Sequence, residues 1–467
     1  MRNILFMLLA LLMVAFSTSS CEDLTEVNED PTRLSDADLS LMAPIVQAGH
    51  YRNEGSNPTR VAGIVMQQLT GFDAQQLAYA ANVIGEDAMD NYWRTGLYAG
   101  TMKDAIVMID KAVEDGNTFY EGLGKLFLAA AMGDATSYFG DIPYSEAFQG
   151  TEFLKPSYDA QESIYAEVQS LLDEAIVAFN ADKGGHVGGD LVFGGDAALW
   201  VKTANALKAR YLMQTQKRQD RSAEVLTLID AAMASSAEQA TFVFGTAETE
   251  NWTLAKFGRE RTNTLTFNEG FAQRLEDNAD PRLTKYAIFD GTNWLYWELG
   301  NPDLVWGRDD AAIPLVSYAE LMFLKAEALL RTGAADADVN EALTAAITAS
   351  MELVELDLMS AEVMDYIAAN GQVSGSFDEK LEQIINEAYV AYYGHNFHQA
   401  WANQRRTGYP VLTPVPGGEA DGLNPGGGIV QRYLYPVSET QTNRENVDAA
   451  RARQGGGLLN ATLWAFE

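Results

Sequence analysis

Apolar residues recur at steps of three and four positions through most of this 467-residue chain. Such spacing lines one face of an α-helix, because a helical turn takes about 3.6 residues. A clear stretch runs from Asp159 to Phe179, where Asp159 and Glu162 also have the spacing of a capping box that opens a helix. Its apolar positions are Ile164, Val168, Leu171, Leu172, Ala175, Ile176 and Phe179. The pattern predicts a mostly all-α fold.

The predicted helices come in pairs that are separated by turns or glycine-rich loops. The periodic stretches lie near residues 97–138, 159–216, 318–351 and 376–400, and Ser376 with Glu379 predicts the start of a helix in the last one. Stacked helix pairs of about 34 residues are typical of tetratricopeptide-type repeats. The pairs in this chain are irregular and widely interrupted, so they indicate such repeats in degenerate form.

Two stretches lack the helical period. Residues 242–308 carry many aromatic side chains among Asn, Gly and Thr, and residues 409–437 hold many of the prolines and glycines. Long irregular segments inside a compact domain usually carry function. We expect the first to be a loop-rich insertion and the second a structured loop with a short strand. The aromatic residues singled out in the first are Trp252, Phe257, Trp294, Tyr296, Trp297 and Trp306.

The first 21 residues have the layout of an export signal. Arg2 is followed by an apolar run, Ile4–Phe16, and by small residues before Cys21, the only cysteine in the chain. The run is shorter than the roughly 20 residues that span a bilayer. The segment resembles a bacterial lipoprotein signal, with residues 1–20 removed and Cys21 lipidated, although Thr18 stands where such signals usually have Leu. The alternative is an ordinary signal peptide with an incidental cysteine. Residues 21–40 are acidic and read as a flexible tether.

The formal net charge is -33. Such a surface repels nucleic acid and anionic lipid, so neither is an expected partner. With one cysteine, no intramolecular disulfide can form.

The chain has no recognisable catalytic motif. Its 65 acidic residues make carboxylate pairs common by chance, so a glycosidase pair cannot be selected from sequence. The two histidines His395 and His398 lack the glutamate and the spacing of a zinc-protease motif and read as a helix-end pair. Asp87, Asp90 and Asn91 do not follow a calcium-loop pattern and read as a solvated acidic loop. We therefore expect no enzyme activity, no metal and no cofactor.

Five short motifs, in order, resemble the SusD/RagB family of outer-membrane nutrient-binding lipoproteins, and the tether residues 28–31 are similar to the start of a SusD-like subfamily. The resemblance covers nearly the whole chain. The motifs are Phe139–Ala147 (FGDIPYSEA), Pro156–Tyr165, Tyr318–Ala328, Trp401–Pro410 (ending RRTGYP) and Arg432–Asn443 (beginning RYLYP). We interpret the prolines of these motifs as structural residues, together with Arg405 and Arg406. Arg432 is expected to pair with Glu439.

The resemblance implies a domain over residues 41–467 that is built on four tetratricopeptide-like helix pairs with ligand-binding loops beside them. It implies a lipid-anchored protein on the outer membrane, exposed at the cell surface. Such a protein captures a nutrient oligomer and delivers it to a SusC-like TonB-dependent transporter, over which it sits as a lid. We expect the oligomer to be a glycan, with a peptide as the alternative.

The expected ligand-binding residues come from two segments. Aromatic faces stack on sugar rings, and amide side chains bond the hydroxyls. The first segment is the early loop whose counterpart in the family often forms part of the ligand surface, and the second is the aromatic insertion. The residues are Phe72, Gln75, Tyr79, Trp252, Trp294, Tyr296 and Trp297. Strand alternation would place Trp294 and Tyr296 on one face and Trp297 on the other. Two other functions stay open, a surface glycan hydrolase and a repeat scaffold that only supports assembly.

Overall fold

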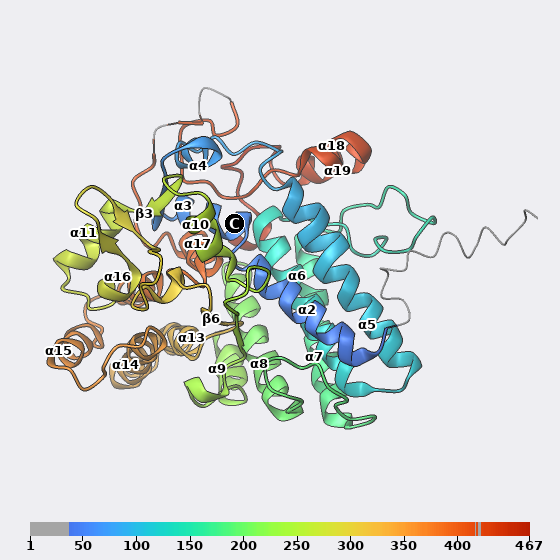
Figure 1. Cartoon of the computed structure of the whole chain (residues 1–467), viewed down its shortest axis with the longest axis horizontal. Coiled ribbons are helices and arrows are strands. Elements are labelled where there is room, and N and C mark those ends of the chain that lie inside the picture. The colour runs from blue at the N-terminus through green and yellow to red at the C-terminus, as the bar shows by residue number, and fades with distance from the viewer. Residues whose placement is uncertain (1–36, 416, 419–421) are drawn as a thin grey trace, which may run out of the picture. The chain divides into compact units, whose positions relative to one another are not determined.

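A computed structural model describes residues 37–415, 417–418 and 422–467 of the chain. The predicted signal segment, Cys21 and the tether up to residue 36 lie outside these residues. Within the described part, helices dominate and the strands form three two-stranded sheets, which confirms the mostly all-α prediction (Figure 1). No helix in this part is both long enough and apolar enough to cross a bilayer. The first described helix, α2 (Leu39–Asn53), begins where the tether was expected to end.

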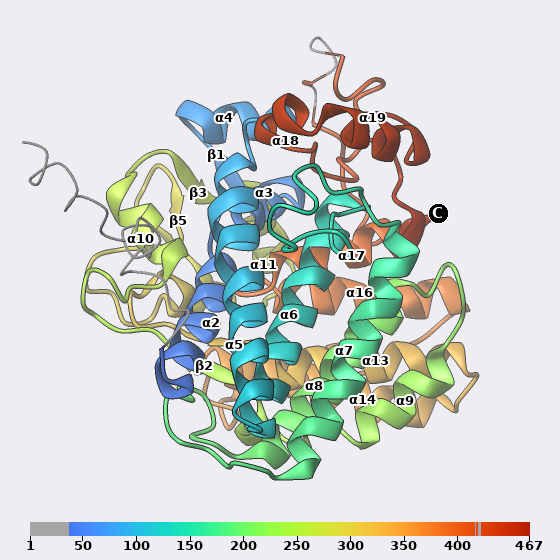
Figure 2. The same cartoon turned by 90° about the vertical axis from the view of Figure 1, so that its right-hand side faces the viewer.

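Three of the predicted periodic stretches fold as pairs of neighbouring helices. They are α5 (Lys103–Glu114) with α6 (Thr118–Phe139), α7 (Gln161–Ala181) with α8 (Ala197–Gln214), and α13 (Tyr318–Arg331) with α14 (Asp336–Leu353). Figure 2 shows α5, α6, α7 and α8 side by side. Nearly every residue of α6 is buried, because α5 and α7 both pack on it and α8 and α2 also contact it.

The fourth stretch contains α16 (Phe377–Ala391) and α17 (Phe397–Thr407). The capping box predicted at Ser376 and Glu379 is present, with each side chain bonded to the other residue's backbone N–H. Helix α16 packs on α13, whereas α17 packs chiefly on α3 (Asn57–Val65). The second helix of this stretch therefore ties the repeat-like helices to the N-terminal part of the fold.

The capping box predicted at Asp159 is wrong. The N-cap of α7 is Ala160, whose methyl side chain cannot cap, and the first helical N–H, that of Gln161, donates to the Asp141 carboxylate at 2.9 Å instead. The Asp159 carboxylate instead accepts hydrogen bonds from the backbone N–H groups of Tyr144 and Ser145, at 2.9 and 2.8 Å, and from the Ser145 hydroxyl. The carboxylate thus closes the turn after Pro143, a contact that local spacing does not encode.

The remaining helices fill the gaps between these pairs. A π-helix, η3 (Tyr92–Met102), runs directly into α5 through a non-helical Gly100, so this helix begins five residues before the expected start at 97. Helix α9 (Ser222–Asp230) packs on α8 and α13, and α15 (Ala361–Asn370) packs on α14.

The insertion at residues 242–308 contains more regular structure than its sequence pattern predicts. It holds the helices α10 (Thr253–Glu260), α11 (Glu269–Asp277) and α12 (Leu283–Tyr286). All three are short, and a helix of one to three turns is too brief for its period to stand out. The strands pair antiparallel: β1 (Leu69–Gly71) with β3 (Leu265–Phe267), β2 (Thr241–Val243) with β6 (Ala312–Pro314), and β4 (Ile288–Phe289) with β5 (Trp294–Leu295).

The short strand expected within residues 409–437 is not found among the described residues of that segment. Backbone carbonyls of the segment accept hydrogen bonds from distant side chains instead: Gln67 bonds Thr413, and Asn82 bonds Val415. The segment ends where α18 (Val437–Thr442) begins, and α19 (Arg444–Arg453) follows.

The arginines of the late motifs are structural. Arg405 and Arg406 lie buried in the last turn of α17, and Arg406 forms an ion pair with Glu327 of α13. Arg405 donates to the backbone carbonyl of Ser137, at 2.6 Å, and its guanidinium lies 4.1 Å from the ring centre of Trp401. These contacts hold α17 against both α6 and α13.

The pairing expected between Arg432 and Glu439 is wrong. Arg432 donates to the carbonyl of Tyr433 and lies over the Tyr435 ring, whereas Glu439 accepts a 2.8 Å hydrogen bond from the hydroxyl of Tyr158. Arg432 thus takes partners from its own segment, whereas Glu439 takes one that packing brings from a distant segment.

Candidate ligand-binding surface

Three aromatic residues follow one another closely at the end of the hairpin formed by β4 and β5. Strand β5 ends at Leu295, so the expected alternation of faces does not extend to the next two residues. Tyr296 is buried, with 1 % of its surface exposed, and its hydroxyl points to the carbonyl of Leu254 at 3.4 Å. Trp294 and Trp297 are partly exposed. Tyr296 is thus a core side chain with no face open to solvent, and it does not belong to the exposed aromatic surface.

Trp294 belongs to an aromatic pair across this hairpin. Its strand partner is Phe289, and their ring centres lie 5.5 Å apart. Phe289 keeps 52 % of its surface exposed, and Phe267 of β3 supports Trp294 from the interior with ring centres 6.5 Å apart. The pair thus offers an exposed aromatic surface on a supported base.

Trp297 lines a cavity of about 280 Å³ within the insertion. The apolar part of its wall comes from Trp297, Ala255, Leu299 and Pro302. Binding sites for small organic ligands are typically concave and apolar, with a few placed polar groups. The polar part of this wall comes from Thr246, Arg259, Glu298, Asn301, Arg308, Asp309 and Asp310.

Both arginines of the cavity are held in place by carboxylates. Arg259 forms an ion pair with Asp309 and donates to the side-chain oxygen of Asn251 at 2.9 Å. Arg308 makes two hydrogen bonds to Glu355, and these bonds raise the pKa of Arg308 above its ordinary value against the opposing effect of burial. A guanidinium has five N–H donors, so such fixed arginines can still donate to a ligand.

The second predicted segment is split between surface and core. Phe72 follows β1, where its backbone N–H bonds the carbonyl of Thr264, and half of its side chain is exposed. Gln75, at the start of α4 (Ala74–Ala80), is also exposed. Tyr79 is 5 % exposed, and burial raises its pKa. Tyr79 therefore does not belong to the exposed part of this segment.

Trp252 is likewise a core residue. Its side chain has no exposed surface and packs on Phe244 with ring centres 5.0 Å apart. Sequence composition does not separate a core tryptophan from a surface one, because both occur among the same polar neighbours in this insertion.

The exposed residues of the early loop and those of the aromatic insertion lie in one region of the fold. Strand β1 precedes Phe72 and pairs with β3, and β3 carries Phe267, which contacts Trp294. Figure 2 shows β1, β3 and β5 below α4 on one side of the described structure. The candidate ligand surface is thus formed by Phe72, Gln75, Phe289, Trp294 and Trp297. Phe289 was missed, although its position opposite Trp294 across a short polar turn, residues 290–293, is a hairpin signal.

A larger cavity, of about 520 Å³, lies between α7, α8 and the C-terminal Trp464. The Arg218 guanidinium covers the Trp464 ring at 5.1 Å from its centre. Since that aromatic face is already occupied, the cavity beside Trp297 is the better candidate for stacking.

Neither the acidic loop around Asp90 nor the pair His395 and His398 forms a ligand site of its own among the described residues. Asp90 accepts a hydrogen bond from the backbone N–H of Ser438 at 2.9 Å, so its carboxylate fixes the start of α18. His395 stacks on Trp306 with ring centres 4.8 Å apart, whereas His398 lies beside Glu54 and Asp134. The two histidines therefore have separate environments.

Comparison with solved structures finds the same fold over about nine-tenths of the chain. A chitin-binding protein is 24 % identical, with a TM-score of 0.75 over 92 % of this chain and 100 % of its own. A SusD-like protein of the Bacteroidetes, AC2a, is 22 % identical, with a TM-score of 0.77 and the same coverage of both chains. A SusD homologue from Bacteroides fragilis is 22 % identical, with a TM-score of 0.74 over 91 % of this chain and 99 % of its own.

Comparison with curated protein sequences gives no match. The sequence of residues 30–436 matches the family described as "Starch-binding associating with outer membrane". This range includes the helix pairs, the aromatic insertion and four of the five motifs in full. The chain therefore belongs to the SusD-like family.

Proposed function

We propose that this protein captures a glycan oligomer at the cell surface and delivers it to a SusC-like TonB-dependent transporter in the outer membrane. The observation that carries the proposal is the exposed aromatic surface of Phe289 and Trp294 beside the cavity at Trp297. The description of the family, and the chitin-binding protein among similar structures, support a carbohydrate ligand.

The physical basis is the match between aromatic rings and sugars. The axial C–H groups of a pyranose form an apolar face that stacks on Trp or Phe, while its hydroxyls need donors and acceptors at the rim. Phe289 and Trp294 supply the first kind of surface, and Arg259, Asn301 and Asp310 supply the second. An exposed aromatic pair and a separate cavity three residues further along the chain could each hold a sugar ring of one oligomer.

In this function a lipid anchor attaches the protein to the membrane, and the protein catalyses no reaction. Lipidation of Cys21 would hold the protein on the membrane. The acidic segment that follows would let the folded domain move relative to this anchor. The transporter would accept the ligand after release. Capture followed by handover requires affinity without bond cleavage, so the protein is proposed to be a binding protein.

A ligand panel tests the proposal. The mature protein, without residues 1–20, is titrated by calorimetry with starch, chitin and other glycan oligomers, and with mixed peptides. Binding of a glycan without the appearance of shorter products supports the proposal. Release of reducing ends would indicate the hydrolase, binding of peptides alone would indicate a peptide carrier, and neither binding nor turnover would indicate a scaffold.

A further inference from the structure

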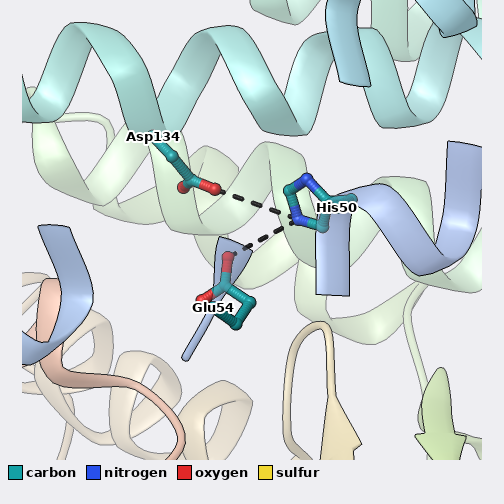
Figure 3. A group of neighbouring side chains, drawn as sticks. All are labelled: His50, Glu54 and Asp134. Carbon is teal, nitrogen blue, oxygen red and sulfur yellow. Dashed lines mark ion pairs between the residues drawn. The ribbon is translucent and has the colours of Figure 1, made fainter. Parts of the chain in front are cut away.

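A compact group of buried ionisable side chains lies away from the aromatic surface, where α2 crosses α6. His50 lies on α2, Glu54 follows one turn later, and Asp134 comes from α6. Figure 3 shows the Glu54 and Asp134 carboxylates approaching the same ring nitrogen of His50. All three residues are more than nine-tenths buried, and one ligand atom from each lies within 4.8 Å of the other two.

The distances from His50 to the two carboxylates are too long for hydrogen bonds. His50 Nε2 lies 3.6 Å from Glu54 Oε1 and 3.9 Å from Asp134 Oδ2, whereas N–H···O bonds measure about 2.7–3.2 Å. His50 Nε2 consequently has no hydrogen-bond partner although it is buried. A buried polar atom without a partner is costly, so this nitrogen needs an explanation.

A small metal ion between the three atoms explains the spacing. With metal–ligand bonds of about 2.0–2.1 Å, tetrahedral geometry separates neighbouring ligand atoms by about 3.3–3.4 Å. The separations of His50 Nε2 from the two carboxylates, 3.6 and 3.9 Å, are about 0.2–0.6 Å wider than this, which side-chain rotation would close. A cavity of about 10 Å³ adjoins the group and is lined by Asn53, Tyr92 and Tyr138 as well as the three ligands. A space of this size holds one water molecule, which would complete four-fold coordination.

The outer oxygens of the carboxylates face the His398 ring. Its Nδ1 lies 3.4 Å from Glu54 Oε2 and its Nε2 lies 3.6 Å from Asp134 Oδ1, and like His50 Nε2 both nitrogens are buried without a hydrogen bond. The Tyr211 hydroxyl donates to Asp134 Oδ1 at 3.4 Å. Metal-binding carboxylates are commonly oriented in this way by a second layer of polar groups.

The local charges also favour a cation. The neighbouring Arg210 makes two 2.7 Å hydrogen bonds to Glu320, so its charge is already balanced. Among the described residues, neither Glu54 nor Asp134 forms an ion pair with a lysine or arginine, and their basic neighbours within 4 Å are the two histidines.

We infer that His50, Glu54 and Asp134 form a structural site for a divalent transition-metal ion, with zinc as the best match, and that His398 orients the two carboxylates. An imidazole with two carboxylates suits zinc better than calcium or magnesium, which prefer oxygen ligands alone. The ion would fasten α2 to α6 and thereby join the N-terminal helix to the buried centre of the fold.

Metal content after refolding tests this inference. Mature protein without a histidine tag is unfolded in guanidinium with a chelator and refolded with or without zinc. Elemental analysis should find one zinc ion per chain after refolding with zinc, and the Tm should exceed that of the metal-free protein. The absence of bound zinc would overturn the inference.

Two isosteric variants distinguish a metal site from a metal-free polar cluster. Asp134→Asn keeps the side-chain shape and an acceptor for Tyr211 but removes a ligand charge, and Glu54→Gln is the alternative if that variant does not fold. We expect either variant to lose zinc and the zinc-dependent rise in Tm, while its metal-free Tm equals or exceeds that of the wild type. His398→Gln should bind zinc about 10–100-fold more weakly.

His186→Gln is the matched control, because His186 is an exposed histidine outside the group and its loss should leave zinc binding unchanged. Retention of zinc by both carboxylate variants would overturn the inference. Anomalous diffraction at the zinc edge would support it if the peak lies between His50 and the two carboxylates, and would overturn it if the peak lies elsewhere.

Discussion

The Trp297 indole lies directly on the backbone of Gly258 in α10. A Cβ atom at position 258 would come within 2.3 Å of the indole Cδ1, which is closer than real side chains approach. The absence of a side chain at Gly258 therefore sets the position of Trp297 in the wall of the cavity.

We predict that Gly258→Ala displaces Trp297 and weakens glycan binding without unfolding the protein. The added methyl group forces the indole to move, since the helix backbone cannot. Calorimetry should report an affinity loss of about 1–3 kcal/mol, the range for a lost anchor side chain. Gly270→Ala in α11 is the control, because its new Cβ would only meet the Asn268 side chain, at 3.2 Å. Equal binding by both variants would exclude Trp297 from the site.

Exposed and buried aromatic residues of the insertion should respond differently to truncation. Phe289→Ala should weaken glycan binding and change the free energy of unfolding little, because half of its side chain is already in water. Trp252→Ala should cost about 3–5 kcal/mol of stability, because it removes a fully buried side chain. Urea unfolding and calorimetry on the same samples measure both effects. A large stability loss for Phe289→Ala with normal binding would place the ligand elsewhere.

The buried ion pair of Glu327 with Arg406 should make stability depend on acid pH. Burial alone would raise the pKa of Glu327, but Arg406 and Arg331 hold it below the ordinary 4.5. A carboxyl whose pKa is lower in the folded state stabilises the protein above its unfolded pKa. We expect this contribution at pH above 4.5 and its loss as pH falls through the lower folded-state value.

Glu327→Gln should therefore cost about 3–5 kcal/mol near neutral pH, because it leaves Arg406 buried without a counter-charge. The difference from the wild type should shrink in urea titrations below pH 4.5. Asp336→Asn, which removes the more exposed ion pair with Lys380, should cost less than about 1 kcal/mol at any pH. A pH-independent loss in Glu327→Gln would show that packing and not charge is responsible.

The anchor is tested by Cys21→Ala expressed in the native bacterium. Stable membrane attachment through lipid takes more than one acyl chain, and all of them would be attached at this residue. We expect the variant in the soluble fraction after cell lysis and the wild type in the outer membrane. A conservative change in the tether, Asp23→Asn, controls for altered export. Sedimentation of the cysteine variant with the outer membrane would contradict lipidation.

The transporter is tested by affinity purification of the native, lipidated protein in mild detergent. We expect a TonB-dependent transporter to co-purify, and to do so from cells grown on the glycan that the protein binds. Recovery of the protein alone, while the transporter is intact in the same membranes, would contradict the proposed partnership.

The helices and several of their boundaries follow from local sequence. The period of apolar residues predicts α7, α8, α13 and α16, and Ser376 with Glu379 marks the start of α16, because a cap depends on residues three positions apart. Short helices such as α10 were not predicted, since eight residues show too little of the period. The family could also be recognised, because its motifs are contiguous.

Tertiary structure decides which side chains are buried and which distant residues meet in one site. Tyr296 and Trp297 are adjacent in sequence, yet the first is buried and the second lines a cavity, because β5 ends at Leu295 and the chain turns there. His50 and Asp134 lie far apart in sequence and meet only where α2 packs on α6. Local sequence determines which residues can form a helix. Which side chains share a site is decided by long-range packing, because the energy of burial depends on neighbours that the local pattern does not contain.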